Sequence, residues 1–127
     1  MILPFLYIEE SPGRGRGVFT AEPIECGTLV EIAPVIVMGP DDRIQLDKTL
    51  LHDYIFEWGE DKTQCCMALG YVPVYNHSSS ANCEYEMDYE NVCIGIRAMR
   101  DIATGEELFV NYNGDWNDTN PLWFEAK

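Results

Sequence analysis

The sequence predicts a mainly β domain built from several short strands with one or two short helices. Segments in which apolar and polar residues alternate, or in which β-branched residues predominate, recur along the chain. Turn signals rich in Gly, Pro, Asn and Asp separate these segments at intervals of roughly 8–12 residues, as is typical of β-rich domains. With 127 residues, the chain is expected to form one domain, residues 1–127.

The strands can be placed in order along the chain. The run 28–38 is the longest, and Pro34 within it favours a sheet edge or a bulge because proline cannot donate a ladder hydrogen bond. Two alternating segments joined by residues 89–91 predict a hairpin. Strands are expected at residues 5–9, 17–20, 28–38, 54–58, 84–88, 92–96 and 107–112.

Three segments favour helix or irregular structure. Asp41 or Asp42 can act as the N-cap of a helix that is expected to end before Tyr54. Residues 64–69 are interpreted as a short helix or loop ended by a glycine. A last short helix is expected to start near Pro121, because proline is favoured in a first helical turn.

Charge and composition exclude some partners. The net charge is −14 and the pI is about 4.2, so the chain lacks the clustered Lys and Arg that binding to a phosphate backbone requires. No direct nucleic-acid partner is expected. The hydrophobic content of 46% and the aromatic content of 12% indicate a folded acidic domain rather than a disordered acidic segment.

The cysteine count and the first residues bear on location. Five cysteines are too few for a disulfide scaffold, and their odd number favours a reducing compartment. The apolar residues 1–8 are too short to span a bilayer. A cytoplasmic or nuclear protein without a membrane partner is therefore expected. No metal site is expected either, because no C-x-x-C pair occurs among the possible ligands, which are Cys65, Cys66, His77, Cys83 and Cys93.

Two short polar motifs carry possible chemistry. Alternate glycines at 13, 15 and 17 allow a ligand to approach the backbone closely, although a flexible turn would look the same. The run Asn76-His77-Ser78 gathers hydrogen-bond donors and acceptors at the end of an apolar stretch, although a lone histidine in a loop is more often structural than catalytic.

Taken together, three segments resemble a known family. Residues 15–19 (Gly-Arg-Gly-Val-Phe), residues 76–82 (Asn-His-Ser-Ser-Ser-Ala-Asn) and residues 105–112 (Gly-Glu-Glu-Leu-Phe-Val-Asn-Tyr) resemble, in order and spacing, the G-x-G, N-H-S-C-x-P-N and G-E-E-L-x-x-D-Y signatures of the SET-domain protein lysine methyltransferases. The resemblance implies a β-clip fold of small sheets, in which the second segment and the C-terminal strand cross in a knot-like arrangement. It also implies S-adenosylmethionine as the cofactor.

The resemblance assigns roles to individual residues. Tyr112 and Tyr85 resemble catalytic tyrosines beside the methyl group and the attacking amine, and Tyr54 and Tyr85 resemble walls of a channel for the lysine side chain. The residues that match cofactor-binding positions are Gly15, Arg16, Gly17, Asn76, His77, Tyr112 and Trp123.

The chain departs from the family pattern at a few positions. Ser79 stands where Cys is frequent, Ala81 where Pro is frequent, and Asn111 where Asp is usual. The cysteine-rich tail that follows the domain in many members is missing, so residues 113–127 are expected to form only a short C-terminal segment. The small size of the chain and the missing tail are compatible with a homodimer.

The expected substrate is the side-chain amine of lysine in a basic, histone-like protein. Free lysine has a pKa near 10.4, and an aromatic channel would lower that pKa by desolvating the ammonium. The acidity of the domain would attract a basic peptide. Part of the outer peptide groove is expected to be lined by carboxylates that could equally form a solvated strand face: Glu84, Glu86, Asp88 and Glu90. The alternatives are a non-catalytic module of the same fold that binds basic peptides, and an enzyme acting on another amine.

Overall fold

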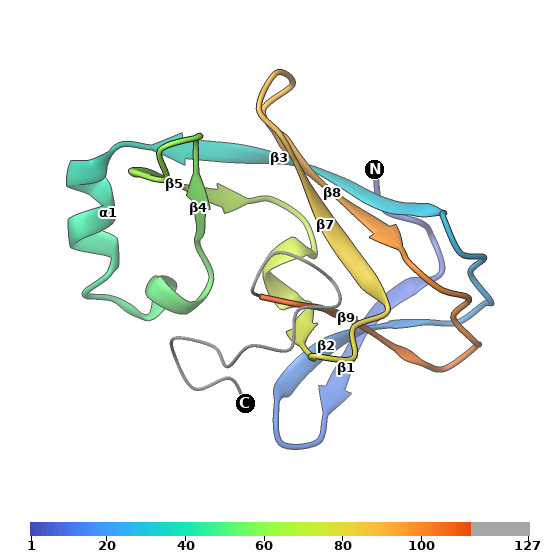
Figure 1. Ribbon diagram of the computed structural model, residues 1–127. Helices are drawn as coiled ribbons and strands as arrows, with labels where there is room; N and C mark the ends of the chain where they lie inside the picture. Colours follow the sequence, from blue (N-terminus) through green and yellow to red (C-terminus); the bar gives the residue numbers. More distant parts are fainter. Residues whose placement is uncertain (113–127) are drawn as a thin grey trace.

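The computed structural model describes residues 1–112, and its fold is mainly β, as the sequence predicts (Figure 1). One sheet has the order β1-β2-β9-β6 and the other the order β4-β5-β3-β8-β7. The strands are β1 (Leu6–Ser11), β2 (Gly15–Thr20), β3 (Leu29–Met38), β4 (Phe56–Trp58), β5 (Gln64–Ala68), β6 (Asn76–His77), β7 (Cys83–Asp88), β8 (Cys93–Ala98) and β9 (Glu107–Val110). The predicted C-terminal helix and Trp123 lie outside the described residues.

The glycine motif lies within a strand rather than ahead of one. β1 and β2 form an antiparallel hairpin in register from Leu6 opposite Thr20 to Ser11 opposite Gly15. Gly13, in the turn, has a φ of +76°, which an L side chain rarely adopts. The expected strand 17–20 therefore begins two residues earlier, and Gly17 lies at its centre, facing β9.

β3 is a central strand, so the expectation that Pro34 marks a sheet edge was wrong. Residues 29–34 of β3 pair with β8, whereas residues 35–38 pair with β5 on the other side. Pro34 stands where the strand changes partner, and its carbonyl accepts a hydrogen bond from the backbone N–H of Leu69 over 2.9 Å. A residue without an N–H is tolerated there because Pro34 is the last β3 residue paired with β8 and precedes the first one paired with β5. The bulge in β3 lies elsewhere, between Leu29 and Glu31.

The predicted helix is split in two. α1 (Pro40–Leu46) has Gly39 as its N-cap and Pro40 in its first turn, so the prediction of Asp41 or Asp42 as N-cap was wrong. Proline fixes the φ of a first helical residue, which starts the helix before the aspartates are reached. The second piece is a 3-10 helix, η1 (Leu50–Asp53).

Residues 64–69 do not form a helix or loop, because most of them belong to the strand β5. β5 pairs with β3 on one side and with β4 on the other. Gln, Met and Ala favour helices locally, but the hydrogen bonds of two ladders outweigh that preference. A short 3-10 helix, η2 (Val72–Val74), follows and leads into β6.

The second sheet curls until its two edge strands meet. β7 and β8 form the predicted hairpin. Although β4 and β7 are at opposite ends of the strand order, Phe56 on β4 lies 5.6 Å from Tyr85 on β7, between ring centroids. Trp58 on β4 and Tyr89, just after β7, lie 4.7 Å apart by the same measure. Aromatic contacts therefore close the curled sheet along this line.

One hydrophobic core joins the two sheets. Val18 and Leu108 from the first sheet and Val30, Ile94 and Ile96 from the second are fully buried in it. Figure 1 shows the β1–β2 hairpin at one end of the molecule and α1 with β4 and β5 at the other. No helix in the described part of the chain has the length and apolar character needed to cross a membrane.

Candidate active site

Two segments far apart in the sequence pair in parallel at the candidate site. β6 lies beside β9, with Asn76 opposite Phe109 and His77 opposite Val110. The ladder continues where the backbone N–H of Ser78 donates to the carbonyl of Val110 over 3.1 Å. This pairing places the second and third motifs side by side, where the family resemblance implies that the two segments cross.

Asn82 holds the same two segments together from inside. Its side-chain Nδ2 donates to the carbonyl of Glu107 over 2.9 Å, and its Oδ1 accepts from the backbone N–H of Phe109 over 2.7 Å. Asn82 is 2% exposed, so both bonds are shielded from water. The amide thus replaces ladder hydrogen bonds that β9 would otherwise lack at this point.

The glycine motif lies against Asn76. The Nδ2 atom of Asn76 donates to the carbonyl of Arg16 over 3.1 Å and to Oε2 of Glu107 over 2.8 Å. A Cβ atom on Gly17 would collide with the Glu107 carboxylate and lie 2.8 Å from Nδ2 of Asn76. Gly17 is therefore required by close packing. Gly15, by contrast, has a φ of +76° and open space around its Cα.

Glu107 is a site residue that the sequence reasoning missed. Its Oε1 accepts a hydrogen bond from the hydroxyl of Ser11 over 2.7 Å, so its carboxylate joins β1, β6 and β9. Its position in the third motif was a signal that could have identified it.

Tyr112 follows β9 and makes hydrogen bonds at three of its atoms. Its hydroxyl donates to the carbonyl of Tyr75 over 2.8 Å, and its backbone N–H donates to Nδ1 of His77 over 3.0 Å. The hydroxyl of Tyr85 donates to the carbonyl of Tyr112 over 3.2 Å. The structure therefore brings the two predicted catalytic tyrosines into contact and joins them to the predicted cofactor-binding histidine.

The surroundings shift the proton equilibria of these groups. Burial, followed by the negative charges of Tyr54, Asp53 and Glu107 in their ionised forms, raises the pKa of Tyr112 to about 12. Burial and then the guanidinium of Arg14 lower the pKa of His77 below its ordinary value of 6.5. At neutral pH both side chains are therefore uncharged.

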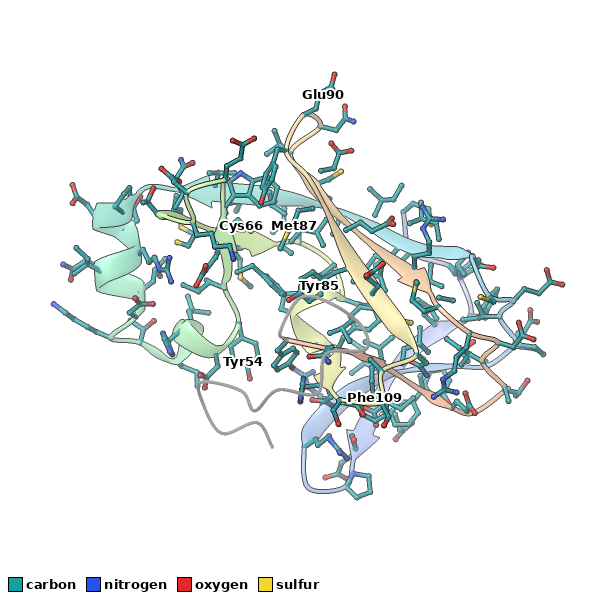
Figure 2. The ribbon with its side chains drawn as sticks, viewed as in Figure 1. Tyr54, Cys66, Tyr85, Met87, Glu90 and Phe109 are labelled. Carbon is teal, nitrogen blue, oxygen red and sulfur yellow. The ribbon has the colours of Figure 1, made fainter. Side chains whose placement is uncertain are left out.

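A cavity of about 430 Å³ opens beside Tyr112. Tyr54 and Tyr85, which were predicted as channel walls, line it together with Tyr112, Tyr75 and Phe56. Figure 2 shows Tyr54 and Tyr85 on separate elements, Tyr54 after η1 and Tyr85 on β7. Neither Tyr75 nor Phe56 was predicted. Phe56 approaches Tyr85 through the curling of the second sheet, and Tyr75 lies at the end of η2.

The carboxylates that line this cavity are different from those expected along the outer peptide groove. Asp47, Asp53 and Glu57 line it, with Arg43 and Lys62 as the basic residues. Alternation along β7 turns Tyr85 and Met87 toward the cavity, so Glu84 and Glu86 belong to the opposite face. The carboxylates at 86, 88 and 90 line a second depression, and Figure 2 shows Glu90 at the hairpin tip, away from Tyr54.

The site thus has two halves that meet at Tyr112. The glycine motif, Asn76 and His77 form one half, outside the lining of the cavity. The aromatic cavity forms the other half. Of the predicted cofactor-binding residues, Arg16 contributes its backbone carbonyl, while its side chain is exposed. A small molecule held on the first half would have one end beside a side chain that enters the cavity.

Among residues 1–112, no cluster of three His, Cys, Asp or Glu side chains has the geometry to hold a metal ion. The five cysteines form no disulfide. Burial raises the pKa values of the Cys66 and Cys83 thiols to about 12, so both remain protonated.

Comparisons with known proteins agree with this geometry. The family model of the SET domain matches residues 15–113. A curated protein of Schizosaccharomyces pombe, the histone-lysine N-methyltransferase specific for H3 lysine-37, is 36% identical over 121 residues, which cover 94% of this chain and 77% of the relative.

Solved structures share the fold. A candidate histone methyltransferase of Plasmodium falciparum aligns with a TM-score of 0.69 and 27% identity, covering 91% of this chain and 98% of that one. Polycomb repressive complex 2 of Chaetomium thermophilum, in an autoinhibited conformation bound to S-adenosylmethionine, aligns with a TM-score of 0.76 and 22% identity. That alignment covers 91% of this chain and 16% of the larger one.

Proposed function

The chain belongs to the SET-domain family of protein lysine methyltransferases, and from this premise we propose that it methylates lysine in a basic, histone-like protein with S-adenosylmethionine as the methyl donor. The observation that carries the proposal is the position of Tyr112. Its backbone bonds to His77 on the proposed cofactor side, and its ring lines the cavity proposed for lysine. A methyl group crossing between the two halves would pass beside this one residue.

The first half of the site fits the cofactor. Gly15 leaves open space next to the Asn76–Arg16 contact, so a ligand can lie close to the backbone there. Arg14 and Arg16 flank Gly15 in the sequence, and their positive charges suit the carboxylate of the methionine part. Gly15, Arg16, Gly17, Asn76 and His77 would hold the cofactor, whose sulfonium would supply an electrophilic methyl group.

The second half suits a lysine side chain. Aromatic rings line the cavity, and such rings attract an incoming ammonium by about 0.5–2 kcal/mol each. The same rings exclude water, which lowers the pKa of the lysine and favours the neutral amine that a nucleophile must be. Tyr54, Tyr85 and Phe56 would form these walls.

Tyr112 acts on the amine as a neutral hydrogen-bonding group and not as a base. Its hydroxyl proton points to the carbonyl of Tyr75, and a pKa of about 12 keeps the phenol protonated at neutral pH. The phenol oxygen can accept a hydrogen bond from the amine N–H and so orient the nitrogen lone pair. Tyr85 supports this arrangement through its bond to the carbonyl of Tyr112.

The proposed substrate class rests on the net charge of the chain and on its similarity to a histone methyltransferase. A net charge of −14 attracts a basic protein at long range, and three carboxylates at the cavity offer partners to basic residues that flank the target lysine. The fission-yeast relative is named for histone H3. A nuclear location is proposed on the same ground.

The test combines binding with transfer. Calorimetry should detect binding of S-adenosylmethionine, and labelled methyl groups should appear on lysines of histones but not on acidic proteins of similar lysine content. Histones acetylated in advance with acetic anhydride serve as a control whose lysine nitrogens are no longer nucleophilic. No binding together with no transfer would refute the proposal, whereas transfer to small amines but not to histones would refute the substrate class.

A further inference from the structure

Glu31 is a completely buried carboxylate that lies against the segment 70–75. It lies on β3 with 0% exposure, and burial raises its pKa above the ordinary value of 4.5. Its Oε1 accepts from the hydroxyl of Tyr75 and its Oε2 accepts from the backbone N–H of Tyr71, both over 2.8 Å. Burying a carboxyl costs free energy that an apolar side chain of similar size would avoid.

The two hydrogen bonds hold both ends of the short helix η2. Tyr71 is the N-cap of this helix and Tyr75 is its C-cap, and neither end is closed by a side chain of its own. Gly70 packs directly against Glu31, because a Cβ atom there would lie 2.5 Å from Oε2. The segment 70–75 therefore packs around the carboxyl group of Glu31.

The far end of η2 reaches the candidate active site. The backbone carbonyl of Tyr75 accepts the hydroxyl proton of Tyr112 over 2.8 Å. Val72, Pro73 and Tyr75 line the cavity, whereas Glu31 does not. A continuous set of hydrogen bonds thus leads from Glu31 through Tyr75 to the hydroxyl of Tyr112.

We propose that Glu31 is a positioning residue for methyl transfer, which fixes η2 so that the carbonyl of Tyr75 holds the hydroxyl of Tyr112 in its working orientation. This inference rests on the proposed function. Glu31 touches neither the cavity nor the glycine motif, so it acts on turnover and not on the binding of cofactor or peptide.

The main test is Glu31→Gln. The amide keeps an oxygen for Tyr75 but places an NH₂ group against the N–H of Tyr71, which loosens η2. We expect kcat to fall about tenfold while KM for the peptide and Kd for the cofactor change by less than about twofold. Tyr75→Phe breaks the same connection from the other side and should behave alike, and it carries the test if the first variant does not fold.

The control is Val30→Ala, which changes the neighbouring buried position of β3. The kcat values of Val30→Ala and Glu31→Gln are compared under conditions in which both variants have lost the same unfolding free energy. Val30→Ala should leave kcat unchanged. A double-mutant cycle adds the decisive comparison, because Glu31→Gln should cost little further activity once Tyr112→Phe has removed the hydroxyl. Additive losses, or equal losses of kcat in Glu31→Gln and Val30→Ala, would overturn the inference.

A spectroscopic measurement separates this inference from the proposed function. With ¹³Cζ-labelled tyrosine, the Tyr112 signal is identified by its loss in Tyr112→Phe. It should shift in Glu31→Gln and Tyr75→Phe and stay in place in Val30→Ala. If the wild-type protein is inactive but the signal shifts in these two variants, the proposed function is refuted and the positioning role of Glu31 is not. If the wild-type protein is active but the signal does not shift in the variants, the positioning role alone is refuted.

Discussion

The backbone N–H of Tyr112 donates a hydrogen bond to Nδ1 of His77 over 3.0 Å, and the two rings lie 5.1 Å apart between centroids. Because Nδ1 accepts, the neutral ring carries its proton on Nε2. The proton state of His77 is therefore linked to the backbone of the residue that joins the two halves of the site.

Acidification should weaken cofactor binding through His77. A proton on Nδ1 removes the acceptor for Tyr112, and the lowered pKa of His77 means that the folded state favours the neutral ring. The stabilising contribution is therefore complete above the ordinary pKa of 6.5 and is lost as the pH falls through the lowered pKa of the folded state. Cofactor affinity measured by calorimetry should fall over the same pH range.

Nitrogen-15 NMR of the His77 ring checks the cause. The ring should show the Nε2–H form and titrate below the ordinary pKa of 6.5. An Nδ1–H form of His77, or an affinity that stays constant while His77 titrates, would contradict the assignment.

Tyr112→Phe should retain the fold and cofactor binding but reduce turnover. Loss of the hydrogen bond to Tyr75 should cost about 1 kcal/mol of unfolding free energy. Loss of the acceptor for the amine should lower kcat by about 10- to 100-fold. Steady-state kinetics compares this variant with Tyr7→Phe, at an exposed ring stacked on Phe19. Turnover equal to the wild-type value would remove the Tyr112 hydroxyl from the mechanism.

Local patterns predicted the strands well where the partner is close in sequence. The β7–β8 hairpin was predicted because alternation and a short turn specify it without reference to the rest of the chain. β5 was not predicted, since Met67 and Ala68 favour a helix locally and its pairing with β3 joins distant residues. The parallel pairing of β6 with β9 was reached only through the family resemblance.

For the site, the motifs predicted residues but not their contacts. Gly17, Asn76 and Tyr112 were assigned to the site through the family resemblance, whereas Glu107 and Tyr75 make contacts that only the folded chain creates. Alternation along β7 correctly placed its carboxylates on one face. These carboxylates were expected outside the lysine channel, and none of them lines the aromatic cavity.

Gly17→Ala should disturb both the fold and the cofactor half of the site. The added methyl group would meet the Glu107 carboxylate and Nδ2 of Asn76, so one of the Asn76 hydrogen bonds must break. Overpacking of this kind costs about 1–3 kcal/mol of unfolding free energy. Cofactor affinity should fall about tenfold, because each factor of ten corresponds to about 1.4 kcal/mol.

Gly39→Ala is the matched control for this substitution. Nothing lies within 4 Å of the Cβ position of Gly39, and its φ of −79° suits alanine. Calorimetry should show that both variants bind the cofactor with the wild-type stoichiometry. The affinity should be lowered only in Gly17→Ala. Equal affinities in the two would show that close packing at Gly17 has no part in binding.

Asn82→Ala should be the most destabilising of these substitutions, because it removes a donor and an acceptor at once. It would leave the carbonyl of Glu107 and the N–H of Phe109 without their side-chain partner in a site where Asn82 is 2% exposed. An unsatisfied buried group costs about 1–3 kcal/mol, so the pair should lower the unfolding free energy by about 2–6 kcal/mol.

Urea denaturation measures this loss against Asn91→Ala, which removes one side-chain hydrogen bond to Asp88 in an exposed turn and should cost less than about 1 kcal/mol. Since Asn82 holds β9 in place ahead of Tyr112, turnover should fall in Asn82→Ala and stay unchanged in Asn91→Ala. Equal stability losses in the two variants would mean that the Asn82 side chain is not what fastens β9 to the second motif.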